Sequence, residues 1–277
     1  MRKLITIMFI IIFGKCYSQT PIQMFWTFNR PISFSDSALF VNKVILNGGS
    51  LTSTERAAIG TLITQLKDSS LWASFTAIYP MVGGSDASCR VNLKSPSTFS
   101  ISFFNSPSFS SNGVDWNGTN QYGNTTVTPS TSLSLNSTSI SYYSRENTAT
   151  PALDMGCNDA LARTYFNPTS YYAINQTIST DSYVNPNTSG LFTISRTASN
   201  LVTEYRNGIS TASTTSVSTA LCTVPIFIGA RNNNTGATGF TDRQCAFAAI
   251  GGGLTAGQSL TFYNIVQTFQ TTLSRQV

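Results

Sequence analysis

The sequence predicts a mainly β protein, a β-sandwich of jelly-roll type that is preceded by a small helical unit and closed by a packed C-terminal helix. Three observations predict this class. Short segments of alternating apolar and polar residues follow one another from residue 96 onward. Asn207-Gly208, between two such segments, is typical of a two-residue hairpin. Capping boxes mark helix starts at Thr52 and Thr255, each with a Glu or Gln three positions later.

Residues 1–18 have the pattern of a cleavable secretory signal. Arg2 and Lys3 precede an apolar run at 4–13, and Cys16 and Ser18 follow it. This run is about half of the roughly 20 residues that a membrane-spanning helix needs, so no membrane span is predicted. The signal pattern therefore predicts a secreted, extracellular or virion-surface location. The alternative to a signal is a buried N-terminal strand or helix.

Residues 19–90 are predicted to form a lead-in and the helical unit. The apolar and aromatic stretch at 21–34 is expected to be a strand or loop. A first short helix covers about 38–45. It ends at the glycines after Asn47, because glycine adopts the left-handed conformation of a helix cap.

A second helix of this unit starts at the Thr52 capping box. Its apolar residues, among them Ile59, Leu62 and Leu66, recur on one face. The apolar face is predicted to continue through 71–79, with further helical structure up to Pro80.

Residues 91–277 are predicted to form the sandwich together with its closing helix. Many short strands at this spacing indicate a sandwich or jelly roll. The helix runs from Thr255 to about residue 275, with Phe262, Val266 and Phe269 at helical spacing. The expected strands are 98–104, 116–127, 133–145, 171–178, 190–197, 200–206, 209–214, 223–230 and 243–250.

The charge pattern argues against binding to nucleic acid. The formal charge is +5, but three of the 16 basic residues lie in 1–18, which leaves 13 against 11 acidic residues. No Lys- or Arg-rich run remains that could follow a phosphate backbone. Charged residues make up only 10% of the chain. Neutral Ser, Thr and Asn fill the intervals between apolar positions, as suits an exported or particle-surface β-protein.

The cysteines leave two interpretations open. Without Cys16 there are four, at Cys89, Cys157, Cys222 and Cys245, and none forms a CxxC pair. Export would permit disulfides in any of three pairings. The favoured interpretation is that they are small buried hydrophobic residues.

Several motifs resemble those of a known family. Residues 204–208 (EYRNG) resemble the tyrosine-arginine-asparagine-glycine hairpin of laminin-G-like and concanavalin A-like jelly rolls, and 116–122 (WNGTNQY) resemble an early turn of the same group. More widely, the chain from about residue 51 to 277 resembles uncharacterised jelly-roll proteins of bacteriophages and Bacteroidetes. The segments that carry this second resemblance are 77–84 (AIYPMVGG), 92–94 (NLK), 111–113 (SNG), 243–247 (RQCAF) and 275–277 (RQV).

This resemblance implies a concanavalin A-like jelly roll and a role in recognition. Laminin-G-like domains mostly serve in adhesion or carbohydrate recognition, and in phages they occur on tail fibres, head fibres and other surface parts. The fold hosts many functions, so the resemblance is a guide to architecture more than to ligand.

The residues do not predict catalysis. The chain has no histidine, which removes histidine-dependent triads and the commonest metal ligand and general base. Some concanavalin A-like relatives hydrolyse sugars with two carboxylates about 5 Å apart. The glutamates here are Glu55, Glu146 and Glu204, on separate segments. A glycosidase or lyase that uses Glu146 or Glu204 is therefore the third hypothesis, and a non-enzymatic function is predicted.

Calcium is the one cofactor considered, because laminin-G-like domains often hold it at their rim. The ion needs six to eight oxygen ligands. Asp154 and Asp159 flank the densest oxygen cluster and are the candidate ligands, and Asp242 lies near a second Asn-rich loop. The alternative, which we favour, is that these residues form turns by bonding to their own backbone.

Sugar recognition needs aromatic rings for the pyranose face together with polar groups for the hydroxyls. A segment around 158–183 combines both. Its tyrosines can equally pack inward with their hydroxyls outward, which is the structural alternative. The candidate ligand-binding residues are Asn158, Arg163, Tyr165, Tyr171, Tyr172 and Tyr183.

The function predicted from the sequence is a non-catalytic surface module for recognition or attachment. It would bind a glycan or cell envelope and would belong to a phage particle or an exported assembly. The alternative is a purely structural subunit that docks onto neighbouring virion or appendage proteins or onto copies of itself.

Overall fold

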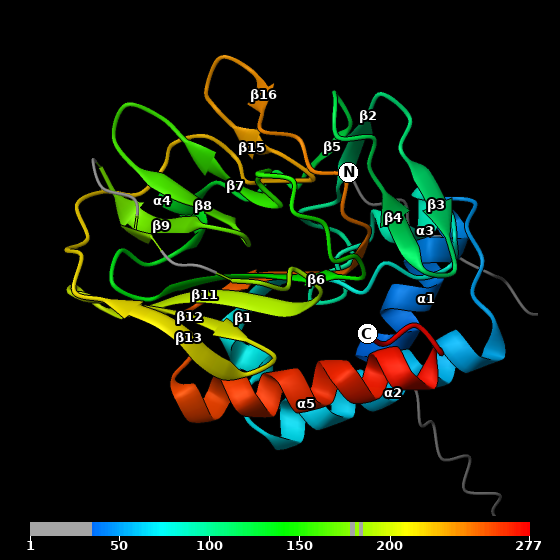
Figure 1. The fold of residues 1–277 in the computed structure, drawn as a ribbon. Helices are drawn as coiled ribbons and strands as arrows, with labels where there is room; N and C mark the ends of the chain where they lie inside the picture. The colour runs from blue at the N-terminus through cyan, green and yellow to red at the C-terminus, as the bar shows by residue number, and fades with distance from the viewer. Residues whose placement is uncertain (1–34, 178–180, 183–184) are drawn as a thin grey trace, which may run out of the picture. The chain divides into compact units, whose positions relative to one another are not determined.

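The computed structural model describes residues 35–177, 181–182 and 185–277. The expected signal segment, the lead-in at 21–34 and Tyr183 lie outside these residues. The described chain from residue 35 forms three layers, in which two β-sheets pack face to face and helices cover the outer face of one sheet (Figure 1). The predicted mainly β sandwich, with helices before it and a packed helix at its end, is confirmed.

Sheet A lies in the middle of the three layers. Its strands follow the order β13-β12-β11-β6-β17-β4-β3, and β1 also pairs with β17. All of these pairs are antiparallel. The strands are β1 Phe75–Tyr79, β3 Ser108–Ser110, β4 Gly113–Asp115, β6 Thr138–Ser144, β11 Gly190–Ala198, β12 Leu201–Arg206, β13 Ile209–Thr214 and β17 Cys245–Gly251.

Sheet B forms one outer layer. Its strands follow the order β10-β9-β8-β7-β14-β5-β2, and β15 pairs in parallel with β7 and in antiparallel with β16. The strands are β2 Ser102–Phe104, β5 Tyr122–Asn124, β7 Met155–Asn158, β8 Arg163–Asn167, β9 Tyr171–Gln176, β10 Asp181–Ser182, β14 Phe227–Ile228, β15 Arg231–Asn232 and β16 Ala237–Thr238.

Strand β6 shows how sheet A serves two cores. Successive side chains of a strand point to opposite faces. Tyr142 therefore packs between the two sheets, while Tyr143 packs against the helices. The hydroxyl of Tyr142 donates to the carbonyl of Arg243 at 2.6 Å and accepts from the indole of Trp116 at 3.2 Å. Both tyrosines are fully buried, so neither is available to a ligand.

The three longer helices, α1, α2 and α5, form the third layer, over the outer face of sheet A (Figure 1). Phe262 of the C-terminal helix lies 4.7 Å from Phe75 of β1 and 6.0 Å from Phe247 of β17, measured between ring centroids. Both predicted capping boxes are present, at Thr52 and at Thr255. The helices are α1 Asp36–Leu46, α2 Ser53–Asp68, α3 Asp86–Cys89, α4 Pro129–Ser132 and α5 Ala256–Thr272.

The prediction of further helix at 71–79 is wrong. A 3₁₀ turn at Trp72–Ser74 leads instead into strand β1, which pairs with β17. Short apolar runs cannot be assigned to helix or strand by periodicity alone. Here Ile78 packs in the core between sheet A and the helices, whereas Ala77 and Tyr79 pack in the core between the two sheets. The segment is therefore a strand that is buried on both faces.

Other strands are shorter than predicted, and some strands were not predicted. The single strand expected at 116–127 is reduced to β5, and the segment containing β7 and β8 was not assigned to strands. The hairpin prediction is confirmed, because Asn207 and Gly208 have φ values of 52° and 75° and join β12 to β13. Both positive angles fit a type I′ turn.

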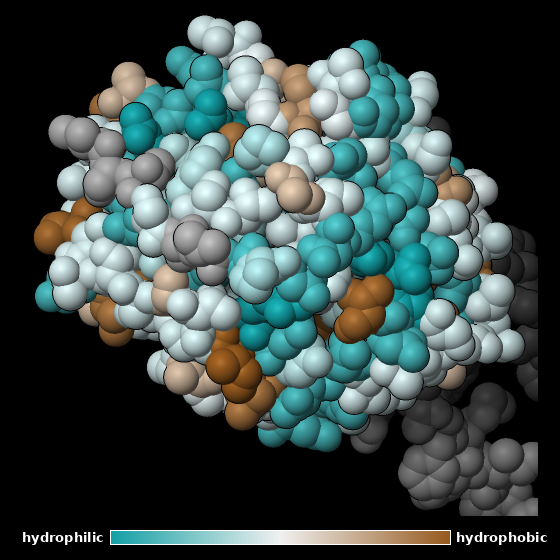
Figure 2. All heavy atoms as spheres, in the orientation of Figure 1, coloured by the Kyte–Doolittle hydropathy of each residue, from teal (hydrophilic) through white to brown (hydrophobic). Residues whose placement is uncertain are grey.

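One face of the molecule carries only small apolar areas. Figure 2 shows one face on which hydrophilic and weakly polar residues predominate and hydrophobic ones lie in small separate areas. Among the described residues, no helix combines the length and apolar character that crossing a bilayer requires. The four described cysteines are buried and free.

Candidate functional site

The predicted sugar-binding residues other than Tyr183, which lies outside the described residues, fall on the three adjacent strands β7, β8 and β9 of sheet B. Alternation decides which of them face outward. Phe166 of β8 and Ile174 of β9 belong to the core between the sheets. Their neighbours Tyr165 and Ala173 belong to a separate small cluster with Leu153. This cluster, together with Tyr171 and the polar residues around it, is the outer face of sheet B.

Tyr165 lies at the centre of this face. It pairs with Gly156 on β7 and with Ala173 on β9. Its ring meets that of Tyr171 edge to face, with centroids 6.1 Å apart. Tyr165 is only 3% exposed, whereas Tyr171 is partly exposed. The ring of Tyr171 is therefore the aromatic surface that a ligand can reach.

The small size of Gly156 makes room for Tyr165. Gly156 has a φ of 148°, and a Cβ built on it would overlap the Cβ of Tyr165 and the carbonyl of Thr164. No residue with a side chain fits this position without moving strand β8. The glycine thus sets the position of the central tyrosine.

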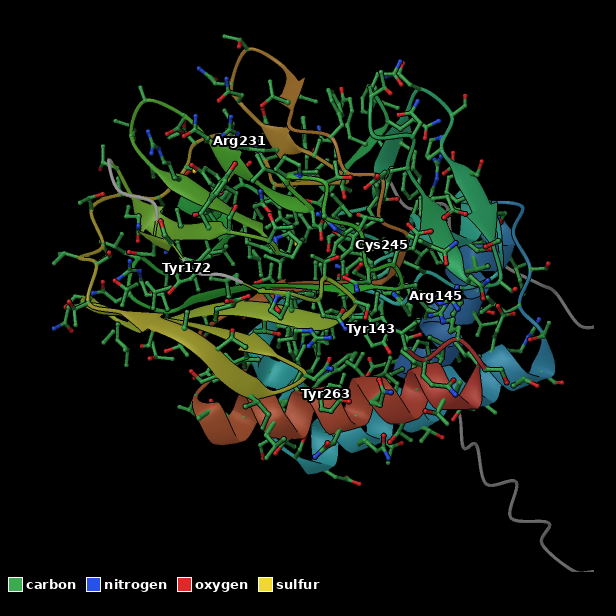
Figure 3. The ribbon with its side chains drawn as sticks, viewed as in Figure 1. Tyr143, Arg145, Tyr172, Arg231, Cys245 and Tyr263 are labelled. Carbon is green, nitrogen blue, oxygen red and sulfur yellow. The ribbon has the colours of Figure 1, made fainter. Side chains whose placement is uncertain are left out.

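Arg231 completes the site and was not predicted from the sequence. Its guanidinium carbon lies 4.9 Å from the centroid of the Tyr165 ring, and its Nη2 donates to Oγ1 of Thr238 at 3.3 Å. Figure 3 shows Arg231 beside β15, whereas Tyr172 and Cys245 lie between the two sheets. The position of Arg231 depends on the parallel pairing of β15 with β7, opposite Gly156, which no local pattern discloses.

Charge and burial shift the pKa of Tyr165 in opposite directions. Burial raises the pKa of Tyr165, while the positive charges of Arg163 and Arg231 lower it, and the net direction is upward. The hydroxyl therefore keeps its proton at neutral pH. Both guanidinium groups are close enough to Tyr165 to influence it.

Amide groups border this face. The side-chain amide of Asn158 donates to the side-chain oxygen of Asn233 at 2.7 Å, joining β7 to the loop after β15. Asn158 also pairs with Arg163 across β7 and β8. The structure therefore brings together Asn158, Arg163, Tyr165 and Tyr171 from the predicted set, and it adds Arg231 and Asn233.

Tyr172 does not belong to this face. It is 1% exposed and packs in the core between the sheets. Because adjacent residues of a strand point to opposite faces, Tyr171 and Tyr172 cannot both contact one ligand on the outer surface.

The two candidate calcium ligands lie in different environments. Asp154 is fully buried and forms an ion pair with Nη1 of Arg243 at 2.7 Å. Burial raises the pKa of Asp154, although the positive charge of Arg243 opposes this change. The second oxygen of the Asp154 carboxylate has no hydrogen-bond partner among the described residues.

Asp159 closes the turn between β7 and β8. Its Oδ1 accepts from the amides of Leu161 and Ala162 at 2.8 and 2.9 Å, and its Oδ2 accepts from the amide of Thr223 at 2.6 Å. Burial acts to raise the pKa of Asp159, but these hydrogen bonds outweigh it and lower the pKa. Within the described ranges, no group of three or more His, Cys, Asp or Glu residues could hold a metal ion.

The candidate catalytic glutamates are engaged in the fold, Glu204 within β12 of sheet A and Glu146 just after the end of β6. Oε2 of Glu146 accepts from the backbone amide of Gln244 at 3.1 Å. Glu204 on β12 is fully buried, and its Oε2 accepts from the hydroxyl of Thr211 at 2.8 Å. Neither lies on the outer face of sheet B.

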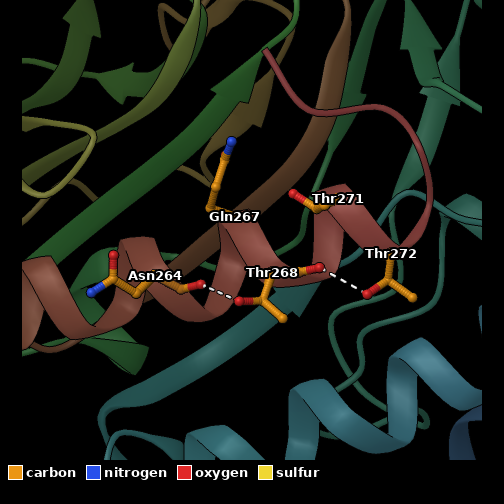
Figure 4. A pocket seen from close by; sticks show the side chains of 5 residues that line it. All are labelled: Asn264, Gln267, Thr268, Thr271 and Thr272. Carbon is orange, nitrogen blue, oxygen red and sulfur yellow. Dashed lines mark hydrogen bonds between the residues drawn. The ribbon is translucent and has the colours of Figure 1, made fainter.

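A pocket of about 410 Å³ lies along helix α5, and its lining is neutral (Figure 4). Thr268 and Thr272 donate to the carbonyls one turn earlier, at 2.8 and 2.9 Å. Their hydroxyl protons are thus already used within the helix. The lining residues are Asn264, Gln267, Thr268, Thr271 and Thr272.

No family model and no curated protein matches the chain. Solved structures with similarity include domain 4 of AbnA, a GH43 extracellular arabinanase from Geobacillus stearothermophilus, in complex with arabinotriose. The identity is 14%, 68% of this chain and 98% of that chain are covered, and the TM-score is 0.45.

Two further solved structures show similarity over a comparable part of this chain. The botulinum neurotoxin serotype D binding domain is 9% identical, with 70% of this chain and 52% of that chain covered and a TM-score of 0.49. A Trypanosoma rangeli sialidase in complex with 2,3-difluorosialic acid is 10% identical, with 69% and 32% covered and a TM-score of 0.45. The chain thus spans about half of the toxin domain and a third of the sialidase.

Proposed function

We propose that this protein is a non-catalytic recognition module that binds a glycan on the outer face of sheet B. One observation carries the proposal. Tyr171 presents a partly exposed ring that Tyr165 holds edge to face at 6.1 Å, the guanidinium of Arg231 lies on the ring of Tyr165, and the Asn158–Asn233 amide pair borders the same face. An aromatic surface with adjacent hydrogen-bond donors and acceptors matches the alternating apolar and hydroxylated surface of a sugar ring.

The rigidity of the face supports this role. Tyr165 and Tyr171 lie on paired strands rather than on loops, so little side-chain order has to be gained on binding. Arg231 lies on Tyr165 and is held by Thr238 of the next strand. The binding groups are therefore already placed in the free protein.

The non-catalytic part of the proposal is supported by the chemistry of the acidic residues. Hydrolysis of a glycosidic bond needs an acid and a base or nucleophile on either side of that bond. The chain has no histidine. Glu146, Glu204, Asp154 and Asp159 each accept hydrogen bonds from the fold, away from Tyr171 or as part of a turn.

The setting that we propose is an exported assembly or a phage particle surface. The signal-like pattern at 1–18 and the resemblance of 51–277 to phage and Bacteroidetes jelly rolls support it. The low content of charged residues, 10% of the chain, fits an exposed surface protein of this kind.

Substitution of Tyr171 by Ala tests the proposed function. We expect a loss of affinity for the bound glycan of about 5- to 30-fold, because one stacked aromatic ring contributes about 1–2 kcal/mol. The measurement is a glycan array followed by calorimetric titration of the best ligand. Tyr263→Ala is the matched control, since Tyr263 is a partly buried tyrosine of the helical layer (Figure 3). Equal affinity of wild type and Tyr171→Ala would disprove the site.

A specific observation favours the structural alternative as a second candidate. Helix α1 exposes Leu39 by 43%, Ile45 by 50% and Leu46 by 82%. Adjacent exposed apolar side chains often mark a protein interface. If this face docks to a neighbouring subunit, Leu46→Asp should convert oligomers to monomers in analytical ultracentrifugation without changing sugar affinity.

A further inference from the structure

We propose that the glycan bound on this face is acidic and that Arg231 contacts its carboxylate. This inference rests on the proposed function and goes further by naming the chemical class of the ligand. The geometry that carries it is the position of the Arg231 guanidinium on the ring of Tyr165, which in turn contacts the partly exposed ring of Tyr171.

Arg231 is held in place but retains donors for a ligand. A guanidinium carries five N–H donors in a planar fork. The hydrogen bond that fixes Arg231 uses Nη2 and ends on the hydroxyl of Thr238. The guanidinium carbon also lies 4.9 Å from the centroid of the Tyr165 ring, and Arg231 is a hydrogen-bond partner of the Tyr165 side chain. Such a fork matches the two oxygens of a carboxylate.

The carboxylates of the surrounding fold do not neutralise this charge. Ion pairs within the described ranges join Lys67 to Asp36, Arg90 to Asp86 and Arg243 to Asp154, and none includes Arg231. Asp159, in the turn after β7, is engaged by backbone amides of its own loop and by Thr223.

A second positive charge reinforces the field at the same point. The positive charges of Arg163 and Arg231 both act to lower the pKa of Tyr165, against the larger effect of burial. An anionic group bound on this face next to Tyr165 would experience the same attraction. A neutral sugar could use the aromatic ring but would leave the guanidinium of Arg231 without an acidic partner.

The test compares acidic glycans with their neutral counterparts. The probe is an array on which oligogalacturonides stand beside their methyl esters and sialylated glycans beside the unsialylated ones. We expect the acidic member of the best-bound pair to bind at least tenfold more tightly. This preference should weaken between about 50 mM and about 500 mM salt, because screening of exposed charges increases with ionic strength.

Arg231→Gln should abolish the preference for the acidic member, so that the acidic and neutral members bind this variant with affinities within about twofold of each other. Arg231→Lys keeps the charge without the planar fork and should keep part of the preference. Lys43→Gln is the matched control, because it removes one positive charge from helix α1 on the far side of sheet A.

The outcomes separate this inference from the proposed function. Equal binding of acidic and neutral members by the wild type, or a preference that persists in Arg231→Gln, overturns the acidic assignment while glycan binding stands. If Tyr171→Ala loses binding to both the acidic and the neutral member and Arg231→Gln does not, the outer face of sheet B is supported as the binding site. A wild-type protein that binds no glycan on the array overturns both proposals. The salt dependence of the wild type gives a result even if Arg231→Gln does not fold.

Discussion

Single residues decide which aromatic rings can meet a ligand. The chain contains two pairs of adjacent tyrosines, and in each pair the pleat of the strand sends one ring to either side. Tyr142 and Tyr143 both end in cores, because sheet A is covered on both faces. Tyr171 and Tyr172 differ, because sheet B has a solvent-facing side, and only Tyr171 lies there.

At the residue scale, Gly156 is a position that tolerates no side chain. Gly156→Ala should destabilise the protein by about 2–4 kcal/mol, because alanine is strained at a φ of 148° and its Cβ overlaps Tyr165. Urea unfolding measures this loss. The matched control is Gly60→Ala in α2, where an added Cβ meets nothing within 4 Å. It should stabilise the helix by about 0.5–1 kcal/mol. Similar effects of both substitutions would contradict the role of Gly156.

At the element scale, the two capping boxes differ in the contacts that they make. In α5, Oε1 of Gln258 accepts from the amide of Thr255 at 2.9 Å and closes its own first turn. In α2, Oε2 of Glu55 accepts from the amide of Thr52 at 2.8 Å, while its Oε1 accepts from the amide of Gly83 at 2.7 Å. Glu55 therefore also ties the helix to the segment that follows β1.

Glu55→Ala should consequently cost more stability than Gln258→Ala. We expect about 2 kcal/mol for the first and about 1 kcal/mol for the second, because the first also leaves the amide of Gly83 without its acceptor. Thermal and urea unfolding of the two variants give the comparison. Glu55→Gln, which keeps one acceptor oxygen, should fall between them. Equal losses would show that the contact to Gly83 adds nothing.

At the scale of the whole molecule, the C-terminus is tied into the interior by Arg275. This side chain is 1% exposed and lies where the helical layer meets the sheets. Burial lowers the pKa of Arg275 to about 10, yet it remains charged at neutral pH. Its donors are satisfied by the side chain of Gln270 and by the carbonyls of Pro80, Met81, Ser111 and Ala246.

The buried thiols predict how the stability of the whole molecule depends on pH. Burial raises the pKa of Cys89 to about 12, and burial also raises the pKa values of Cys157 and Cys245. Above about pH 9 the unfolded chain releases these protons while the folded protein keeps them. The stabilising contribution is therefore complete below about pH 9 and declines as the pH rises toward 12.

The free energy of unfolding should fall by about 1 kcal/mol for each such thiol between about pH 9 and pH 10. Urea unfolding at a series of pH values measures the slope. Cys89→Ala should reduce the slope of the unfolding free energy against pH by the contribution of one thiol. A stability that stays constant from about pH 8 to pH 10 would contradict the burial of these thiols.

Much of the fold was predictable because its signals are local. The Asn207-Gly208 turn, the two capping boxes and the helical periodicity after Thr255 each depend on residues a few positions apart. The mainly β class followed from strand periodicity. The assignment of 71–79 failed because a short apolar run fits a helix or a doubly buried strand equally well, and only pairing with β17 decides between them.

The site was predictable only in part. The sequence by itself determined that tyrosines, asparagines and an arginine gather between 158 and 183. Only the tertiary structure decided that Tyr171 faces solvent, that Tyr172 is interior and that Arg231, more than 60 positions along the chain from Tyr165, lies on its ring. The physical reason is that hydrogen bonding between distant strands sets which residues become neighbours, and no local periodicity encodes that pairing.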